Sequence, residues 1–192
     1  MTRDFRAGVT IIRSERPEDV AQIRRVEERA FGRRAEADLV DTLRRVSPDA
    51  VSLVAEDGVV VGHVLFTPVI VEGERQQLLG MGLAPMAVLP DRQREGIGSL
   101  LVRRGLEVLR NRGCPFVVVV GHPKFYPRFG FEPASKHGLL SQWKGVPDEA
   151  FMTLILDAHV MGGASGVARY LDEFNQFGEP HDDRTSRYPS PG

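Results

Sequence analysis

A run of five apolar residues, Phe116–Val120, most constrains the fold of this chain. A strand this apolar is typical of one that is buried on both faces of a sheet. It follows a stretch, Ile97–Val108, in which apolar residues recur at helical spacing, and that stretch follows another extended run, Leu78–Leu89. Strand, helix and strand in this order predict a crossover, which requires helices packed on a sheet.

The remaining segments predict helices and a meander around this unit. Helical spacing runs from Pro17 to Phe31 and again over Leu39–Val46, and Glu56-Asp57-Gly58 is a hairpin signal between two β-branched runs. Together these segments predict an α/β (α+β) fold of three layers with a central mixed sheet. The expected strands are Val9–Ile12, Val51–Ala55, Val59–Val71, Leu78–Leu89, Phe116–Val120, a piece around Phe131, and Phe151–Leu156.

The composition excludes several classes of protein. The 192 residues include 25 basic and 26 acidic side chains, and this balance removes the electrostatic case for a general nucleic-acid binder. No apolar run approaches the roughly 18 residues of a membrane span, and the N-terminus lacks the apolar segment of a secretory signal. A single cysteine, Cys114, cannot form an internal disulfide, so the reducing cytoplasm is the expected location.

One domain is expected over residues 1–160, followed by two shorter segments. Gly162–Gly166 is typical of a hinge, and Tyr170, Leu171, Phe174 and Phe177 recur at helical spacing after it. Residues 161–178 are therefore predicted to form a helical extension packed on the domain. Residues 179–192 are expected to form a flexible tail.

The loop between Leu89 and the crossover helix is the most informative segment for function. It holds Gln93, Arg94, Glu95, Gly96, Ile97, Gly98 and Ser99 where a strand turns into a helix. The first amides of a helix are unpaired donors at the positive end of its dipole, and glycines let a large oxyanion approach them. Arg94 and Arg92 can add charge-assisted hydrogen bonds. The loop thus predicts a pyrophosphate site. The alternative interpretation is that its glycines only form a tight turn between the strand and the helix.

Two other phosphate-binding loops are excluded by the same residues. A P-loop requires lysine after its last glycine, but Ser99 follows Gly98. A dinucleotide-binding loop requires a third glycine where this chain has Leu101.

The chain resembles the GNAT superfamily of N-acetyltransferases in two motifs. Residues Gln93–Gly98 match the pattern Gln/Arg-x-x-Gly-x-Gly/Ala of that superfamily's acetyl-CoA loop, and they follow a strand of matching type, Met86–Pro90. The run Phe125-Tyr126-Pro127-Arg128-Phe129-Gly130-Phe131 is similar to a motif in its second half. The two motifs stand in order, one helix and one apolar strand apart, and the resemblance covers roughly residues 9–158.

This resemblance implies a sheet that is mostly antiparallel and splays between its fourth and fifth strands. Acetyl-CoA is then the cosubstrate and no metal is required. Pantetheine is implied to pair with the main chain of Met86, Ala87 and Val88, and the pyrophosphate to lie on Arg94–Gly98. The implied cofactor-binding residues are Met86, Ala87, Val88, Gln93, Arg94, Glu95, Gly96, Ile97, Gly98 and Ser99.

The implied reaction is direct attack by a primary amine of a small molecule or peptide on the acetyl thioester. Tyr126 is the implied catalytic residue, because the family commonly places a tyrosine beside the sulfur, where it can donate a proton to the leaving thiolate. The alternative is a structural aromatic whose hydroxyl bonds to the backbone, within a cluster with Phe125, Phe129 and Phe131.

The sequence does not identify the general base. Glu36 and Asp38 lie where family members often bind the acceptor, but a solvated helix start explains them as well. His122 follows the apolar strand and either reaches the cleft or orders a loop. The other four histidines show no metal-ligand spacing, and Cys114 is expected to be a packed, inert thiol.

Charge distribution is the only clue to the acceptor. Residues 91–112 hold six arginines against three acids, which suits a phosphate-rich cofactor, and residues 145–183 hold eight acids against one arginine. If the acidic stretch borders the acceptor site, it favours a cationic amine, although such a stretch is often only a solvated face.

Two alternative hypotheses about the function remain beside that of an acetyltransferase. The first is a non-catalytic acyl-CoA-binding regulatory module, against which the presence of Tyr126 argues. The second is an RNA-associated protein, which is disfavoured because Glu95 and Glu107 interrupt the basic run. The oligomeric state is left open, with a homodimer as one option.

Overall fold

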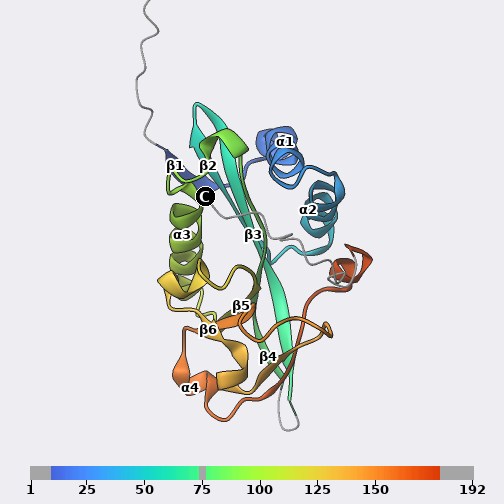
Figure 1. The fold of residues 1–192 in the computed structure, drawn as a ribbon, viewed down its shortest axis with the longest axis vertical. Coiled ribbons are helices and arrows are strands. Elements are labelled where there is room, and N and C mark those ends of the chain that lie inside the picture. Colours follow the sequence, from blue (N-terminus) through green and yellow to red (C-terminus); the bar gives the residue numbers. More distant parts are fainter. Residues whose placement is uncertain (1–9, 74–76, 178–192) are drawn as a thin grey trace, which may run out of the picture.

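The computed structural model describes residues 10–73 and 77–177. Its elements follow one another in the order seen in Figure 1. They are β1 (Ile11–Ser14), η1 (Pro17–Asp19), α1 (Val20–Phe31), α2 (Ala35–Val46), β2 (Val51–Asp57), β3 (Val59–Glu72), β4 (Gln77–Val88), η2 (Pro90–Arg92), α3 (Ile97–Asn111), β5 (Phe116–Val120), η3 (Tyr126–Phe129), β6 (Glu132–Pro133), η4 (Ala134–His137), β7 (Leu139–Ser141), β8 (Phe151–Ile155), α4 (Ala158–Met161), β9 (Gly166–Arg169) and η5 (Asp172–Phe177), where η marks a 3-10 helix.

The nine strands of the described residues belong to one mixed sheet. Its main path runs β1-β2-β3-β4-β5-β8-β6, and β9 pairs with β3 and with β7. The neighbours on the main path are antiparallel except β4 and β5, which α3 connects in the parallel sense. The predicted fold class and the strand–helix–strand crossover are therefore confirmed.

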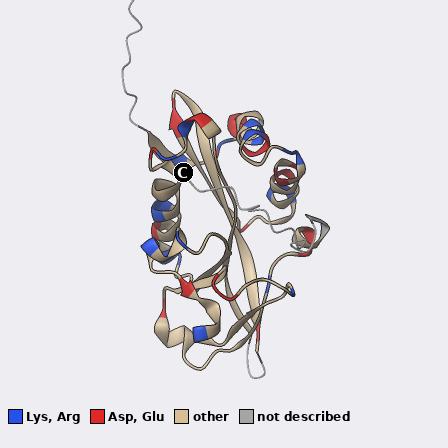
Figure 2. Cartoon of the chain, in the orientation of Figure 1, with Lys and Arg blue, Asp and Glu red and all other residues tan. Residues whose placement is uncertain are grey.

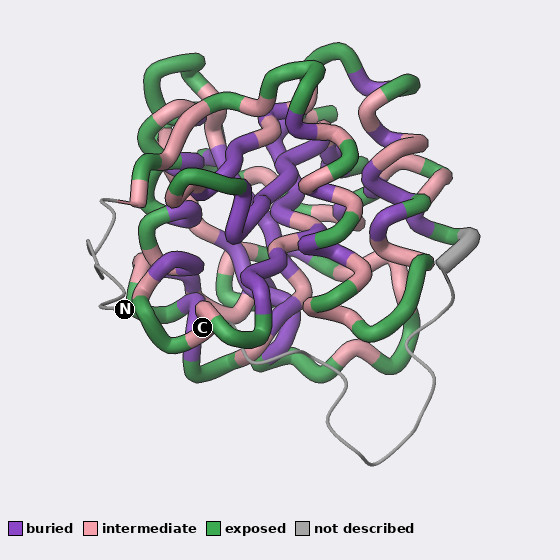
Figure 3. The backbone as a smooth tube through the Cα atoms, turned by 90° about the horizontal axis from the view of Figure 1, so that it is seen from above, coloured by how far each residue is buried: buried purple, intermediate pink, exposed green. Residues whose placement is uncertain are grey.

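Helices cover both faces of the sheet, as Figure 1 shows: α1 and α2 lie on one side and α3 on the other. Close approach of α3 depends on glycine, since a Cβ at Gly105 would stand 2.3 Å from the ring of Phe66. Phe66 is fully buried, and buried residues concentrate between the layers (Figure 3). This packing fixes where α3 begins, and hence where its N-terminus points.

Side chains of both signs are interspersed along α1, α2 and α3, while β3 carries a charge only at its end, Glu72 (Figure 2). Within the described residues, no helix is both long and apolar enough to cross a bilayer.

The predicted hairpin between β2 and β3 is confirmed, and the first strand is shifted. Val9 lies outside the described residues, and β1 extends to Ser14 because Ile11–Ser14 pair with Leu53–Glu56 of β2. Pro68 lies where β3 has no partner on one side among the described residues, since β2 pairing ends at Phe66 and β9 pairing begins at Ile70. A residue without an N–H is tolerated at such an edge.

The predicted helix over the C-terminal extension is wrong in its first half. Residues Gly166–Arg169 form β9, whose Val167–Arg169 pair with Ile70–Glu72 of β3. Pairing with a distant strand overrides the helical spacing of the sequence, and only η5 remains helical. The extension still packs on the domain, because Tyr170 and Phe174 are 6% and 8% exposed.

Candidate functional site

The loop that leads into α3 adopts an unusual backbone conformation. Gly96, the residue before the helix, has φ +83°, and a Cβ there would meet no atom within 4 Å. Arg94 has φ 68°, in the left-handed region that non-glycine residues rarely adopt. Two left-handed residues so close together turn the chain sharply from the end of β4 into the helix, and the open space at Gly96 leaves the loop accessible.

The first turn of α3 carries free amides. The first helical hydrogen bond runs from the amide of Leu100 to the carbonyl of Gly96, so the amides of Ile97, Gly98 and Ser99 have no acceptor within the helix. No side chain of the described chain caps them. Such amides, at the positive end of the helix dipole, bind anions. The first turn of α3 therefore offers three amide donors, and the pyrophosphate site stays a prediction.

The side chains of the loop divide into those already engaged and one that is free. Arg92 binds Asp57 at 2.9 Å and Glu95 at 2.8 Å, while Gln93 donates to the carbonyl of Val88 at 3.2 Å. Arg94 is exposed and forms no ion pair within the part of the chain that the structure describes. Arg94 is thus the guanidinium available to an anion, whereas Arg92 and Gln93 hold the loop in place.

β4 and β5 separate after only two paired positions, Met81 with Val117 and Gly82 with Val118. Met86–Val88 pair with β3 on their other side. Beyond Gly82 the β4 edge that faces β5 has no ladder partner among the described residues. We call this opening the fork; its exposed backbone can accept an extended ligand as an added strand would.

A cavity of about 280 Å³, the fork cavity, lies between these diverging strands. It brings together four residues singled out from the sequence: Glu36, Met86, His122 and Tyr126. Asp38 is absent from this lining, and its carboxylate binds Arg24 at 2.6 Å. The full lining is Phe31, Arg33, Glu36, Leu39, Leu83, Ala84, Pro85, Met86, Val120, Gly121, His122, Tyr126 and Phe174.

Tyr126 is buried and lines the fork cavity, and no hydrogen bond to another described residue contributes to the pKa of its hydroxyl. Its ring packs edge-on against Phe125 and Phe131, with centroid distances of 5.0 and 5.6 Å. Burial raises the pKa of the phenol, so the hydroxyl keeps its proton at neutral pH. The aromatic cluster of the alternative interpretation is thus present, and the role of the hydroxyl stays a prediction.

Glu36 supplies the only carboxylate in the lining of the fork cavity. Arg33 binds it through Nε at 3.0 Å, and the Glu36 side chain is 13% exposed. His122 accepts a hydrogen bond at Nδ1 from the amide of Lys124 at 3.3 Å. Both side chains can exchange protons with a group in the cavity, and the geometry alone does not rank one above the other.

Several cavity residues were not identified from the sequence. Phe31 and Leu39 belong to helical apolar stripes, and the same stripe pattern describes core residues. Phe174 reaches the cavity because η5 packs against α2, and this placement follows from the pairing of β9 with β3. The local sequence does not predict the long-range pairing of β9 with β3.

The described residues contain no group of three or more His, Cys, Asp or Glu side chains placed to hold a metal ion. Cys114 donates from its thiol to the carbonyl of Phe116 at 3.1 Å, and burial raises the pKa of the thiol. A raised pKa keeps the sulfur protonated and a poor nucleophile.

Comparison with known proteins places these features in a family. A family model described as "Acetyltransferase (GNAT) domain" matches residues 11–134. The uncharacterized N-acetyltransferase YhbS of Escherichia coli K12 is 40% identical over 169 residues, covering 87% of this chain and 99% of the relative. The uncharacterized N-acetyltransferase YjhQ of the same strain is 48% identical over 120 residues, covering 61% of this chain and 66% of the relative.

Two solved structures that share the fold were determined in complex with CoA or acetyl-CoA. The crystal structure of E. coli YhbS in complex with CoA has a TM-score of 0.82 and 36% identity, covering 93% of this chain and 98% of that one. A GNAT family acetyltransferase from Brucella melitensis in complex with acetyl-CoA has a TM-score of 0.68 and 36% identity, covering 87% and 99%.

Proposed function

The chain belongs to the GNAT acetyltransferase family, and on that premise we propose that it transfers an acetyl group from acetyl-CoA to a primary amine of a small molecule or peptide. One observation carries the proposal: β4 and β5 part after Gly82 and Val118, and Met86 and Tyr126 both line the cavity between the two strands.

The residues at the fork fit coenzyme A. The amides of residues 97–99 offer donors to a pyrophosphate, and Arg94 adds a guanidinium that no carboxylate of the described chain neutralises. The backbone of Met86–Val88 offers an edge for the pantetheine amides. Glu95 stays paired with Arg92, so its carboxylate is partly neutralised next to the phosphates.

In the transfer, the amine nitrogen forms a bond to the acetyl carbon and the bond from that carbon to sulfur breaks. Tyr126 lines the cavity and keeps its proton because it is buried, and in the proposed reaction it donates that proton to the departing thiolate. The amine must lose a proton as well, since an ordinary ammonium has a pKa of about 10.4. Glu36 and His122 are the titratable groups of the cavity that can receive it, directly or through water.

The surroundings of the cavity favour a cationic acceptor. Glu36 is paired with Arg33 in the lining, so the support comes from η5, which begins with Asp172 and Glu173 and packs against α2. Negative charge on this side of the cavity would attract an ammonium. The mainly apolar lining indicates that the group next to the reacting nitrogen is a hydrocarbon.

Steady-state release of CoA thiol from acetyl-CoA, in the presence of a panel of amines, tests the proposal. Diamines and lysine-like amines are expected to be turned over faster than neutral or acidic amines of the same length, and added salt should reduce that preference. If acetyl-CoA binds and no amine in the panel is acetylated, a non-catalytic acyl-CoA-binding module explains the fork better.

A further inference from the structure

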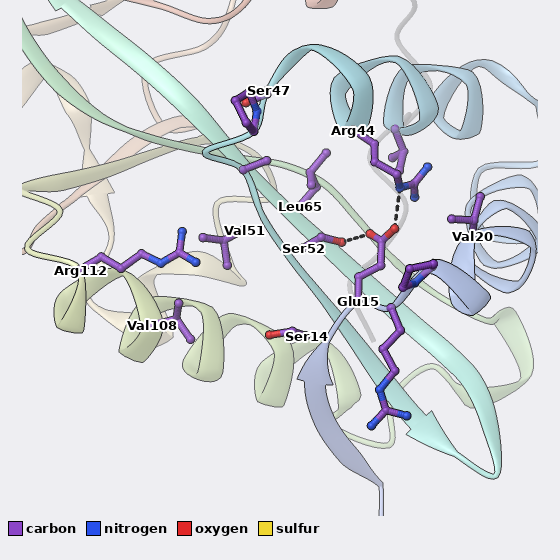
Figure 4. A pocket seen from close by; sticks show the side chains of 15 residues that line it. Ser14, Glu15, Val20, Arg44, Ser47, Val51, Ser52, Leu65, Val108 and Arg112 are labelled. Carbon is purple, nitrogen blue, oxygen red and sulfur yellow. Dashed lines mark hydrogen bonds and ion pairs between the residues drawn. The ribbon is translucent and has the colours of Figure 1, made fainter.

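A second cavity, the edge cleft, opens where β1 ends at Ser14 (Figure 4). β1 pairs with β2 only over Leu53–Glu56, so Val51 and Ser52 lie beyond the last pair. The last turns of α2 and α3 form two walls. The edge cleft has a volume of about 540 Å³ and shares no lining residue with the fork cavity, so it is a separate site.

One side of the edge cleft is apolar. Val51 of β2, Leu65 of β3 and Val108 of α3 line it, and in Figure 4 Val51 and Leu65 lie between the arginines of the two walls. A concave site with apolar walls and a few fixed polar groups is the usual form of a small-molecule site.

A connected series of polar side chains runs from the cleft into the core. The carboxylate of Glu15 accepts from Arg44 Nε at 2.5 Å and from the hydroxyl of Ser52. Ser52 lies 3.0 Å from Nε2 of His63, whose Nδ1 lies 2.6 Å from the buried carboxylate of Glu27. Both oxygens of Glu15 are thereby engaged, and the polar wall of the cleft is held in one arrangement.

The cleft has more hydrogen-bond donors than the protein itself uses. Nη2 of Arg44 and Oγ of Ser47 are buried without a partner within the described residues, and Ser47 as a whole is 6% exposed. Arg112 extends from the end of α3 toward Val51 (Figure 4) and forms no ion pair with any described residue. Arg44 is bound by two carboxylates, those of Glu15 and Asp41, so the positive charge left over among the described lining residues is that of Arg112 and Arg16.

We propose that the edge cleft binds a small organic monocarboxylate with an apolar body. The carboxylate would lie between Arg112 and Arg44, which approach from opposite walls, and the body would cover Val51, Leu65 and Val108. Glu15 disfavours a second negative charge on the ligand, and the apolar wall disfavours a bare inorganic anion.

Octanoate, with octanamide as its uncharged analogue, tests this site in protein saturated with CoA. Methyl NMR titrations are expected to show octanoate shifting the methyl signals of Val51, Leu65 and Val108, with an affinity at least tenfold higher than that of octanamide. Equal affinities for the two probes, or shifts confined to Leu83 and Val120 of the fork cavity, would overturn the assignment.

Two variants at the end of α3 test whether the charge of Arg112 is the one that binds the carboxylate of octanoate. Arg112→Gln is expected to weaken octanoate binding about tenfold and leave CoA affinity unchanged, because Arg112 lines only the edge cleft. Arg110 is also exposed and lies two positions before Arg112, but it does not line the edge cleft. The variant Arg110→Gln should therefore bind octanoate as the wild type does. Indistinguishable octanoate affinities in the two variants would refute the proposal.

Discussion

The ring of Tyr126 lies against the backbone of Gly121, so closely that a Cβ added at Gly121 would stand 2.2 Å from Cε2 of the tyrosine. Gly121 directly follows β5, the strand that diverges from β4. The end of β5 therefore determines where the phenol stands in the fork cavity. This contact connects the splayed sheet to the proposed proton donor.

Replacing Tyr126 with phenylalanine removes only the hydroxyl. Because no hydrogen bond to a described residue contributes to the pKa of that hydroxyl, we expect the free energy of unfolding to change little. Turnover of a verified amine should fall by roughly 10- to 1000-fold, within the usual range for loss of a general acid, while CoA affinity is retained. Unchanged turnover, measured as thiol release, would exclude Tyr126 from the mechanism.

Gly121→Ala should displace the Tyr126 ring without removing its hydroxyl. We expect a stability loss of about 1–3 kcal/mol from overpacking and a lower kcat with near-normal CoA affinity. Gly162→Ala is the matched control, since Gly162 has φ −55° and a Cβ there meets its nearest atom at 3.4 Å. If Gly121→Ala retains full kcat, the position of the ring is not critical.

Arg94→Gln should weaken CoA binding by roughly 10- to 150-fold, because a charge-assisted hydrogen bond to a phosphate contributes about 1.5–3 kcal/mol. The glutamine keeps a Cβ at the left-handed position, so the backbone strain is the same in both proteins. Arg104→Gln removes an exposed arginine of α3 that binds Glu107, and it serves as the control in calorimetric titrations with CoA. Equal losses in the two variants would indicate a general charge effect.

Glu27 and His63 form a buried pair, 2.6 Å apart and fully inaccessible to solvent. His63→Leu leaves the carboxyl of Glu27 without a partner and should cost about 3–5 kcal/mol in urea unfolding. The double variant Glu27→Leu/His63→Leu should be more stable than His63→Leu alone, because the carboxyl of Glu27 is no longer buried without its partner. A double variant as unstable as the single one would contradict this reasoning.

Asp19 accepts hydrogen bonds from Arg13 at 2.6 and 2.9 Å and from the amide of Arg16 at 2.8 Å. The bond to Arg13 is the main cause that holds the pKa of this carboxyl below its ordinary value of 3.8. A lowered pKa stabilises the fold above pH 3.8, and this contribution is lost as the pH falls through the lower folded value.

Asp19→Asn should therefore be less stable than the wild type at pH 7, and the difference should narrow as the pH falls below 3.8. Urea unfolding at both ends of this range measures the difference. A constant difference across the range would show that the ionised carboxylate is not what stabilises this region.

Much of the fold could be predicted from local patterns. Five consecutive apolar residues predicted β5, and helical spacing after a glycine-containing loop predicted α3; both were confirmed. The extension after Gly162 was predicted wrongly because its apolar spacing suits a helix, while its backbone pairs with β3 about 100 positions earlier in the chain. The spacing of apolar residues predicts which side chains become buried, but it does not predict which strand the segment's backbone pairs with.

The candidate site divides in the same way. Gln93–Ser99 and Tyr126 could be named in advance, since glycines, arginines and a strand-to-helix boundary are local features. The sequence could not identify Phe31 and Phe174 as cavity residues, nor the hydrogen-bond donors of the edge cleft that have no acceptor among the described residues. These features depend on which helix ends face one another.

The sequence by itself determined the crossover unit and the loop whose amides begin α3, since both depend on short-range dihedral and hydrophobic preferences. Tertiary structure alone decided that β4 and β5 part after Gly82 and Val118, and that Tyr126 reaches the gap. Those positions follow from how side chains of distant segments share one close-packed interior, in which each contact depends on all its neighbours.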